Sequence, residues 1–265
     1  MPDLEADRGR LRRALTNVLG RGAGDAAVRV LAGGLSNSSY AVTHGGRRYV
    51  VRLARPTAGS TLTLDDELAL LHAVAAAGLT PEPIGVDAAT GALVTRYLPG
   101  GKPWSADDAR DLANIERIAV FLRRLHRVPA QIREFVPTQY AQAYIEQAGA
   151  LDARAQAAAA ELRELAADYR TGHAATCVCH NDLVAANVLD DGQLWLVDFE
   201  YAASSSPILD LASLAVMNAF GPEHVAALLR AYCAPLLTPF PPAEFAKVAR
   251  LVELTAYFWE LASAK

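Results

Sequence analysis

The chain has 265 residues, of which 52% are hydrophobic and 20% are charged, and its formal net charge is −4. This length is sufficient for one large domain or for two lobes with an ample core. The small negative charge and the lack of a basic run argue against a nucleic-acid partner. No apolar run reaches the roughly 18 residues of a membrane span, and the charged N-terminus is unlike a secretory signal. We therefore expect a cytoplasmic protein without a membrane partner, whose oligomeric state is open.

The three cysteines form an odd and sparse set, which argues against a disulfide scaffold and fits a reducing compartment. Cys177 and Cys179 would lie on one face of a strand, since side chains alternate along a strand. They precede His180, but no second pair of Cys or His residues stands nearby in the sequence. We therefore interpret them as small buried residues rather than as zinc ligands.

Hydrophobic periodicity predicts a first part rich in strands and a second part rich in helices. The pattern changes after Arg96, where we place the lobe boundary, so the two lobes are residues 1–96 and 97–265. The first lobe is expected to contain strands at 28–32, 40–43, 49–53, 84–86 and 92–95 and helices at 4–20 and 65–74. The second lobe is expected to contain helices at 106–127, 138–170 (in one or two pieces), 208–217, 222–234 and 243–263, with a turn at 204–206.

The turn between the first two strands contains Gly34, Ser36 and Asn37. Glycines let the backbone approach a phosphate, and Ser and Asn side chains with free N–H groups can cradle it. The segment is not a G-x-G-x-x-G motif, and an ordinary polar hairpin turn would have a similar composition. Both interpretations stay open on the residues alone.

Arg52 lies in the third predicted strand, on the same face as apolar neighbours. A charge in such a place needs a partner. Glu67 is the candidate, because it shares the apolar face of helix 65–74 and therefore points inward. The sequence predicts an Arg52–Glu67 ion pair, which either presents the guanidinium to nucleotide phosphates or is a surface pair without a function.

Oxygen-bearing side chains stand between short apolar runs in the segment 179–201. Asp182 is followed by Asn187 five positions later and by Asp198 eleven positions beyond that. Phosphoryl transfer needs one carboxylate to orient the nucleophile, and an Asn plus an Asp to hold Mg²⁺ against phosphate. The full spacing, with Glu200 directly after Phe199, favours this chemistry over a chance Asp-rich loop.

Several residues of the second lobe leave two interpretations open. Tyr257 and Trp259, beside an acid in the last helix, could cage a quaternary ammonium group by cation–π attraction, although such residues more often pack as core. Asp210, near the start of helix 208–217, would either hold the catalytic loop by accepting backbone N–H groups or cap its helix. His126 is interpreted as a helix-end residue rather than a ligand, and Tyr144 could line a pocket or simply pack, with packing favoured.

These segments together resemble the choline/ethanolamine kinase branch of the aminoglycoside phosphotransferase-like superfamily, with the bacterial choline kinases of surface-glycan decoration as the nearest type. The set H-x-D-x-x-x-x-N followed by D-F-E is specific for the superfamily, and D-F-E-Y points to the choline kinase side. Arginine at position 52 is similar to choline kinases, whereas most kinases have lysine there. The resemblance rests on the turn 34–37, Arg52, Glu67, His180, Asn181, Asp182, Asn187 and the run Asp198–Tyr201.

The resemblance implies an α+β, bilobal protein-kinase-like fold, with a small antiparallel-sheet N-lobe and a larger, mainly helical C-lobe. It implies that ATP binds with Mg²⁺ in the cleft, with adenine against the hinge at Thr95–Tyr97. Asp182 would be the catalytic base, supported by His180 and Asn187, and the metal ligands would be Asn187, Asp198 and Glu200. The implied nucleotide-binding residues are Gly34, Ser36, Asn37, Arg52, Glu67, Thr95, Tyr97 and Leu189. The implied substrate residues are Asp182, Glu200, Tyr201, Tyr257 and Trp259.

The resemblance thus implies an ATP-dependent kinase that phosphorylates the hydroxyl of a small cationic alcohol, choline or a related amino alcohol such as ethanolamine. One alternative is an aminoglycoside, other antibiotic or thiamine kinase of the same fold. Another is a nucleotide-binding pseudokinase that serves as an interaction module. The presence of Asp182, Asn187 and Asp198 disfavours the pseudokinase.

Overall fold

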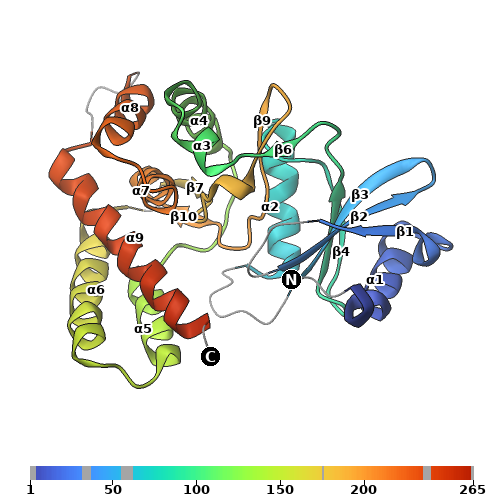
Figure 1. The fold of residues 1–265 in the computed structure, drawn as a ribbon, viewed down its shortest axis with the longest axis horizontal. Helices are drawn as coiled ribbons and strands as arrows, with labels where there is room; N and C mark the ends of the chain where they lie inside the picture. Colours follow the sequence, from blue (N-terminus) through green and yellow to red (C-terminus); the bar gives the residue numbers. More distant parts are fainter. Residues whose placement is uncertain (1–3, 32–36, 55–61, 175, 235–239, 264–265) are drawn as a thin grey trace. The chain divides into compact units, whose positions relative to one another are not determined.

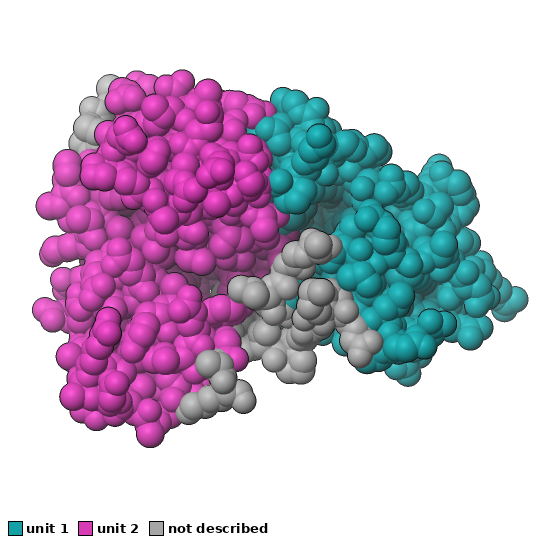
Figure 2. All heavy atoms as spheres, viewed as in Figure 1, with its two compact units in different colours: residues 1–57, 62–103, 188–197 teal, residues 58–61, 104–187, 198–265 magenta. Residues whose placement is uncertain are grey.

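The computed structural model describes residues 4–31, 37–54, 62–174, 176–234 and 240–263. The chain divides into two compact units, coloured separately in Figure 2. The first unit consists of residues 1–57, 62–103 and 188–197, and the second consists of residues 58–61, 104–187 and 198–265. The sequence predicts a boundary after Arg96, whereas the first unit extends to Pro103 and also includes the segment 188–197.

The first unit is built on a five-stranded antiparallel sheet with the strand order β1-β2-β3-β5-β4. In this register Arg52 of β3 is paired with Ser39 of β2 and with Leu93 of β5, so it lies in the middle of the sheet. The strands are β1 (Ala27–Val30), β2 (Asn37–His44), β3 (Arg47–Ala54), β4 (Pro83–Asp87) and β5 (Ala92–Arg96).

Two helices cover opposite faces of this sheet, as Figure 1 shows. Helix α1 (Leu4–Leu19), which is followed by the short 3₁₀ helix η1 (Ala23–Asp25), buries its apolar side against Val51 and Leu53 of β3. Because side chains alternate along a strand, Arg52 points to the other face. Helix α2 (Leu64–Ala76) provides Glu67 on that other face.

A smaller sheet completes the first unit. It consists of β6 (Lys102–Pro103), β8 (Val188–Asp190) and β9 (Leu194–Leu196) in the order β6-β8-β9. The backbone N–H of Leu196 donates to the carbonyl of Leu79, 2.8 Å away, which ties the β8–β9 hairpin to the segment after α2. The short strand β6 is not predicted by the sequence.

The second unit is mainly helical, and α7 lies at its centre. Eight consecutive residues of α7, from Ile208 to Ala215, are buried, as expected for a helix that is covered on all sides. The unit also contains the 3₁₀ helix η2 (Ala185–Asn187) and the antiparallel pair β7 (Cys177–Cys179) and β10 (Ala203–Ser205). Its helices are α3 (Ala106–Arg110), α4 (Leu112–Leu125), α5 (Pro137–Ala148), α6 (Ala153–Gly172), α7 (Pro207–Met217), α8 (Pro222–Cys233) and α9 (Pro242–Ser263).

Two predicted elements of the second unit are wrong. The single helix expected at 106–127 is two helices, because Asp111 adopts an extended backbone and its side chain accepts the N–H of Asn114 as the N-cap of α4. The turn expected at 204–206 is also wrong in part, since Ser204 and Ser205 belong to β10 and pair with β7. Ser206 then precedes Pro207, which opens α7 as a favourable first helical residue.

Candidate functional site

The loop that carries Asp182 is anchored through its backbone to α7. Asp210, which is fully buried in the first turn of α7, accepts the N–H groups of His180 at 2.9 Å and Asn181 at 2.8 Å. The Asn181 side chain donates to the carbonyl of Tyr201 at 2.9 Å and thereby joins the loop to the segment after Asp198. The prediction that Asp210 holds this loop is confirmed.

Asp182 and Asn187 lie in direct contact. The amide nitrogen of Asn187 donates to the Asp182 carboxylate and to the Asp182 carbonyl, both at 2.9 Å. Burial raises the pKa of Asp182, and the nearby Asp198 carboxylate raises it further, whereas His180 and the hydrogen bond from Asn187 lower it. An oriented carboxylate whose pKa is raised is a better proton acceptor than an ordinary surface Asp.

The backbone is strained at two positions of this site. Asn181 and Asp198 have φ values of 63° and 68°, and among the described residues only Ala219 shares a positive φ without being glycine. A non-glycine residue in this region costs of order 1–2 kcal/mol, so the surrounding structure must hold it there. Phe199, which is fully buried, packs edge-to-face on His180 with ring centroids 4.5 Å apart and thereby connects the loop after β7 to the segment after Asp198.

Acidic and aromatic side chains gather beside Asp182. Burial raises the pKa of the Tyr201 phenol, and the carboxylate of the buried Glu200 raises it further, while the adjacent Trp259 lowers it. The Tyr201 hydroxyl is buried and has no hydrogen-bond partner of standard geometry among the described residues. Trp259 comes from α9, so this group joins the last helix to the loop that carries Asp182.

Tyr144 of α5 belongs to the same group, although its sequence pattern favours packing over a role in a site. Burial raises the pKa of the Tyr144 phenol, and so do the neighbouring Tyr201, Glu200 and Asp182. Tyr257 differs from Trp259 in orientation. It precedes Trp259 by two positions, which is about 200° around an α-helix, and therefore points from the other side of α9.

The predicted Arg52–Glu67 ion pair is present in the first unit. Arg52 Nη2 donates to Glu67 Oε2, and only 8% and 3% of the two side chains are exposed. The α2 N-terminus near Glu67 is capped by Thr63, whose hydroxyl accepts the N–H of Asp66 at 3.1 Å. A buried acid thus holds a guanidinium in one orientation on the face of the sheet that α2 covers.

The other predicted nucleotide-binding residues are spread over the first unit. Gly34 and Ser36 lie outside the described residues, and Asn37 is the buried first residue of β2. Thr95 is paired with Val50 in the sheet. Tyr97 follows β5, and the Arg48 guanidinium covers its ring 3.6 Å from the centroid. Leu189 is half-buried in β8.

The donor atoms around Asp182 suit a hard cation. Asn187, Asp198 and Glu200 provide amide and carboxylate oxygens, which are the ligands that Mg²⁺ prefers. Because Asn187 uses its amide nitrogen for Asp182, its amide oxygen is the atom that would bind a cation. An amide and two carboxylates are oxygen ligands, which suit Mg²⁺ better than zinc.

Comparison with known proteins shows to which family the chain belongs. A sequence model described as the phosphotransferase enzyme family matches residues 27–246. The chain belongs to this family. Its match to the protein LicA of Haemophilus influenzae is 25% identical over 214 residues, covering 76% of this chain and 61% of that protein's length.

Solved structures show the fold. The choline kinase LicA from Streptococcus pneumoniae has a TM-score of 0.77 at 22% identity, covering 89% of this chain and 86% of the other. A choline/ethanolamine kinase family protein from Mesorhizobium loti has a TM-score of 0.72 at 25% identity, covering 97% and 84%. An aminoglycoside-3'-phosphotransferase of type VIII has a TM-score of 0.63 at 25% identity, covering 93% and 99%.

These findings confirm the predicted α+β, protein-kinase-like fold and the predicted membership of the phosphotransferase family. None of the helices in the described part of the chain combines the length and the apolar character that crossing a membrane requires. The comparisons do not assign roles to the individual site residues.

Proposed function

We propose that the protein transfers the γ-phosphate of ATP to the hydroxyl group of choline or of a related amino alcohol such as ethanolamine. The observation that carries this proposal is the group formed by Asp182, Glu200, Tyr201 and Trp259 within the second unit. It combines a carboxylate that can orient a hydroxyl with acidic and aromatic groups that attract a cation.

In this proposal Asp182 is the catalytic base. Its carboxylate orients the substrate hydroxyl and accepts the proton as the hydroxyl oxygen forms a bond to the γ-phosphorus. The bond between that phosphorus and the β–γ bridging oxygen breaks, and ADP leaves. Asn187 keeps the carboxylate in position by the 2.9 Å hydrogen bond, and Asp210 fixes the backbone that bears it. Most of the catalytic effect then comes from positioning and charge neutralisation.

Asn187 and Asp198 are proposed to hold Mg²⁺, which neutralises charge that develops on the phosphate oxygens. Glu200 is proposed as a further ligand or as the acid that attracts the substrate cation. Both roles agree with its burial and with its influence on Tyr201. His180, which is fully buried against Phe199, supports the loop and does not contact substrate in this assignment.

Arg52 is proposed to bind the α- and β-phosphates of ATP. A guanidinium can form two parallel hydrogen bonds to phosphate oxygens, whereas an ammonium group is a point charge. Glu67 would then act as a positioning residue for Arg52. Asn37, Thr95, Tyr97 and Leu189, with Gly34 and Ser36, remain proposed contributors to nucleotide binding. We also propose a cytoplasmic location. The cysteines of the described residues are free thiols, which fits a reducing compartment, and the proposed substrate ATP is available there.

An ATP-consumption screen tests the proposal directly. Purified protein with Mg²⁺ would be offered choline, ethanolamine, thiamine, aminoglycosides, macrolides and simple sugars, and ADP formation would be measured. We expect turnover with choline or ethanolamine at the highest kcat/KM. Preferred turnover of an aminoglycoside would support the antibiotic kinase, for which the 25% identical aminoglycoside phosphotransferase is a precedent. ATP binding without turnover of any alcohol would support the pseudokinase.

Two substitutions on α9 test how the substrate cation is recognised. Trp259→Ala removes the ring beside Tyr201, and Tyr257→Ala removes a ring from the other side of the same helix. A cation–π contact contributes about 0.5–2 kcal/mol, so KM for choline should rise roughly 2- to 30-fold in Trp259→Ala. Tyr257→Ala should leave it nearly unchanged, and KM for ATP should change in neither variant. Equal effects of the two substitutions would contradict a specific role of Trp259.

A further inference from the structure

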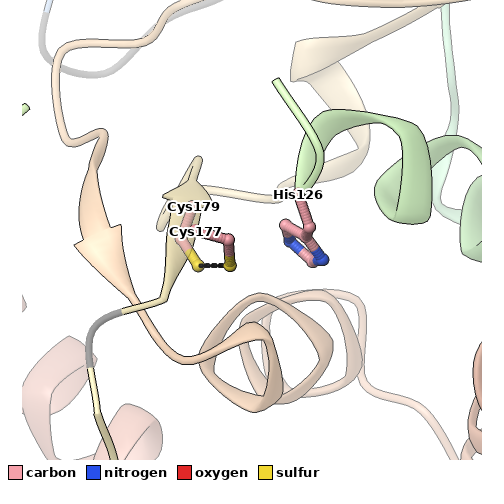
Figure 3. A group of neighbouring side chains, drawn as sticks. All are labelled: His126, Cys177 and Cys179. Atoms are coloured by element: carbon pink, nitrogen blue, oxygen red, sulfur yellow. Dashed lines mark hydrogen bonds between the residues drawn. The ribbon is translucent and has the colours of Figure 1, made fainter. Parts of the chain in front are cut away.

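A second cluster of metal-ligating side chains lies behind the catalytic loop in the second unit. Cys177 and Cys179 come from β7, and His126 follows the end of α4, 51 residues before Cys177. One ligand atom from each of the three residues lies within 4.8 Å of those from the other two. Figure 3 shows the two sulfur atoms side by side on the strand and the imidazole ring beside them. None of these residues takes part in the proposed phosphoryl transfer.

The spacing of the two sulfur atoms fits a tetrahedral metal ion. Cys177 Sγ and Cys179 Sγ are 3.7 Å apart. In a tetrahedral zinc site with Zn–S bonds of about 2.3 Å, two sulfur ligands are about 3.8 Å apart. The thiols now donate weak hydrogen bonds to the carbonyls of Ser205 and Ser206 at 3.4 and 3.5 Å, which a metal would replace with little loss.

The hydrogen bonds of the His126 imidazole resemble those of many zinc-bound histidines. Its Nε2 lies 3.0 Å from the Asp210 carboxylate, so Nε2 is the nitrogen that carries the proton. Its Nδ1 then accepts the hydroxyl proton of Tyr232 at 2.7 Å and presents a lone pair on that side. Zinc-bound histidines commonly donate their other N–H to a carboxylate, which fixes the ring and increases the basicity of the ligand nitrogen.

We propose that Cys177, Cys179 and His126 form a binding site for a thiophilic d¹⁰ cation of the Zn²⁺ class. The ligand atoms are the two Sγ atoms and His126 Nδ1, with a water molecule in the fourth position. On binding, each thiol releases its proton to solvent, and the Tyr232 hydroxyl gives up its contact with Nδ1. Two thiolates compensate the charge of the divalent ion, so the buried site carries no net charge.

The site is linked to the catalytic loop by one residue. Asp210 contacts His126 Nε2 and also accepts the backbone N–H groups of His180 and Asn181. An ion on Nδ1 would therefore hold the imidazole, and through it Asp210, in the arrangement that supports the loop. An ion that binds only the folded chain stabilises the folded state by mass action. Zn²⁺ should therefore raise the Tm of the protein.

Titration of the reduced, full-length protein with Co²⁺ tests the site without reference to catalysis. Tetrahedral thiolate coordination gives intense d–d bands and a thiolate-to-Co²⁺ charge-transfer band, and Zn²⁺ should displace the Co²⁺. We expect one ion per chain. Cys177→Ala removes a half-buried ligand and should weaken binding by more than the roughly 10- to 100-fold that loss of an outer-shell partner costs. Cys233→Ala, which removes the third cysteine, is the matched control and should bind Co²⁺ as the wild type does.

Tyr232→Phe tests the assignment of the ligand nitrogen. This variant keeps the imidazole and both thiols and removes the hydroxyl that competes for Nδ1, so Co²⁺ should bind at least as tightly as in the wild type. Weaker binding would contradict Nδ1 as the ligand atom. Absence of the thiolate spectrum in the wild type, or an unchanged affinity in Cys177→Ala with folding verified by circular dichroism, would overturn the proposed site and leave the cysteines as packing residues.

Discussion

Glu67 in the first unit and Asp210 in the second are both almost completely buried acids, but they are compensated in different ways. Glu67 is paired with the guanidinium of Arg52, which is a full positive charge on a side chain. Asp210 accepts two backbone N–H groups, from His180 and Asn181, and faces the imidazole of His126. One acid therefore orients a side chain, and the other shapes a segment of backbone.

This difference follows from the kind of functional group that each unit carries and from the backbone that carries it. The first unit offers the guanidinium of Arg52 from a central β-strand. The sheet already fixes the backbone of this strand, so only the side chain needs orientation. The second unit offers carboxylate and amide oxygens on a loop, where no ladder fixes the backbone. There the acid must replace the missing backbone partners. Positioning residues should thus affect nucleotide binding in the first unit and turnover in the second.

The largest effect is expected at the acid that Asp210 positions. Asp182→Asn should lower kcat by roughly 10²–10⁴, since loss of a positioned general base costs about that much. Because burial raises the pKa of Asp182, the wild-type rate should fall on acidification at a pH above the range of an ordinary Asp, and the variant should lack this acid limb. Steady-state kinetics as a function of pH measure both effects.

The same substitution should not destabilise the fold. A carboxyl group whose folded-state pKa is raised lowers stability at neutral pH, where it is ionised, and this cost disappears below its unfolded-state pKa. Asp182→Asn should therefore equal or exceed the wild type in urea unfolding at neutral pH without nucleotide or metal. A large loss of stability, or near-full turnover with retained ATP binding, would contradict the assignment of Asp182 as the base.

Removing the charge of Glu67 breaks the buried pair of the first unit. Glu67→Gln leaves the Arg52 guanidinium buried without its carboxylate, and breaking such a pair by removing one partner costs about 3–5 kcal/mol of unfolding free energy. In protein that remains folded, KM for ATP should rise more than kcat falls. Asp65→Asn, an exposed acid in the same helical turn, is the matched control for urea unfolding and kinetics. Equal stability of the two variants would refute the positioning role.

Asp210→Asn should lower kcat more than it raises KM for ATP, which is the reverse of Glu67→Gln. Its loss of unfolding free energy should be smaller. An amide can accept on one side only, so its NH₂ group must face one of the N–H donors on the loop. An unsatisfied buried donor costs about 1–3 kcal/mol. We expect kcat to fall less than in Asp182→Asn, with KM for ATP little changed. Ser213→Ala, on the same helix as Asp210, is the control. It removes only a longer contact, in which the N–H of Leu183 donates to the Ser213 hydroxyl at 3.4 Å, and it should change kcat much less. A raised KM for ATP at constant kcat would contradict the comparison.

Much of this arrangement is predictable because its signals are local. Strand alternation and the apolar face of one helix are sufficient to predict the Arg52–Glu67 pair, and the spacing of Asp182, Asn187 and Asp198 predicts a shared site. The family resemblance adds the fold. These patterns need no knowledge of which distant segments meet.

What the sequence could not predict depends on tertiary contacts. Tyr144 has the spacing of a core residue, and the segment between β9 and β10 brings Tyr201 near it only in the folded chain. The serines of β10 resemble a turn but form a strand because β7 offers a partner. His126 joins Cys177 and Cys179 only in the folded chain. Asp111 carries a local signal for a helix start, yet it stands inside an apolar periodicity that continues on both sides.

The smallest effect on stability is expected for an exposed ion pair of the second unit. Comparing it with the buried Arg52–Glu67 pair tests how much burial matters. Glu161 of α6 accepts two hydrogen bonds from Arg250 of α9, both at 2.8 Å, but more than 40% of each side chain is exposed. These bonds lower the pKa of Glu161, so their stabilisation is present above its unfolded-state pKa and is lost as the pH falls through the folded-state value.

Glu161→Gln should therefore lower Tm only slightly at neutral pH, and not at a pH where Glu161 is protonated. In about 1 M salt, where the Debye length is about 3 Å, the difference should also vanish, whereas the effect of Glu67→Gln should persist because buried charges are screened much less. Differential scanning calorimetry measures the Tm at neutral pH, at the lower pH and in high salt. The control is Glu164→Gln, which changes an exposed acid one turn along α6. A loss in Glu161→Gln as large as that in Glu67→Gln would mean that the number of hydrogen bonds, rather than burial, determines what an ion pair contributes here.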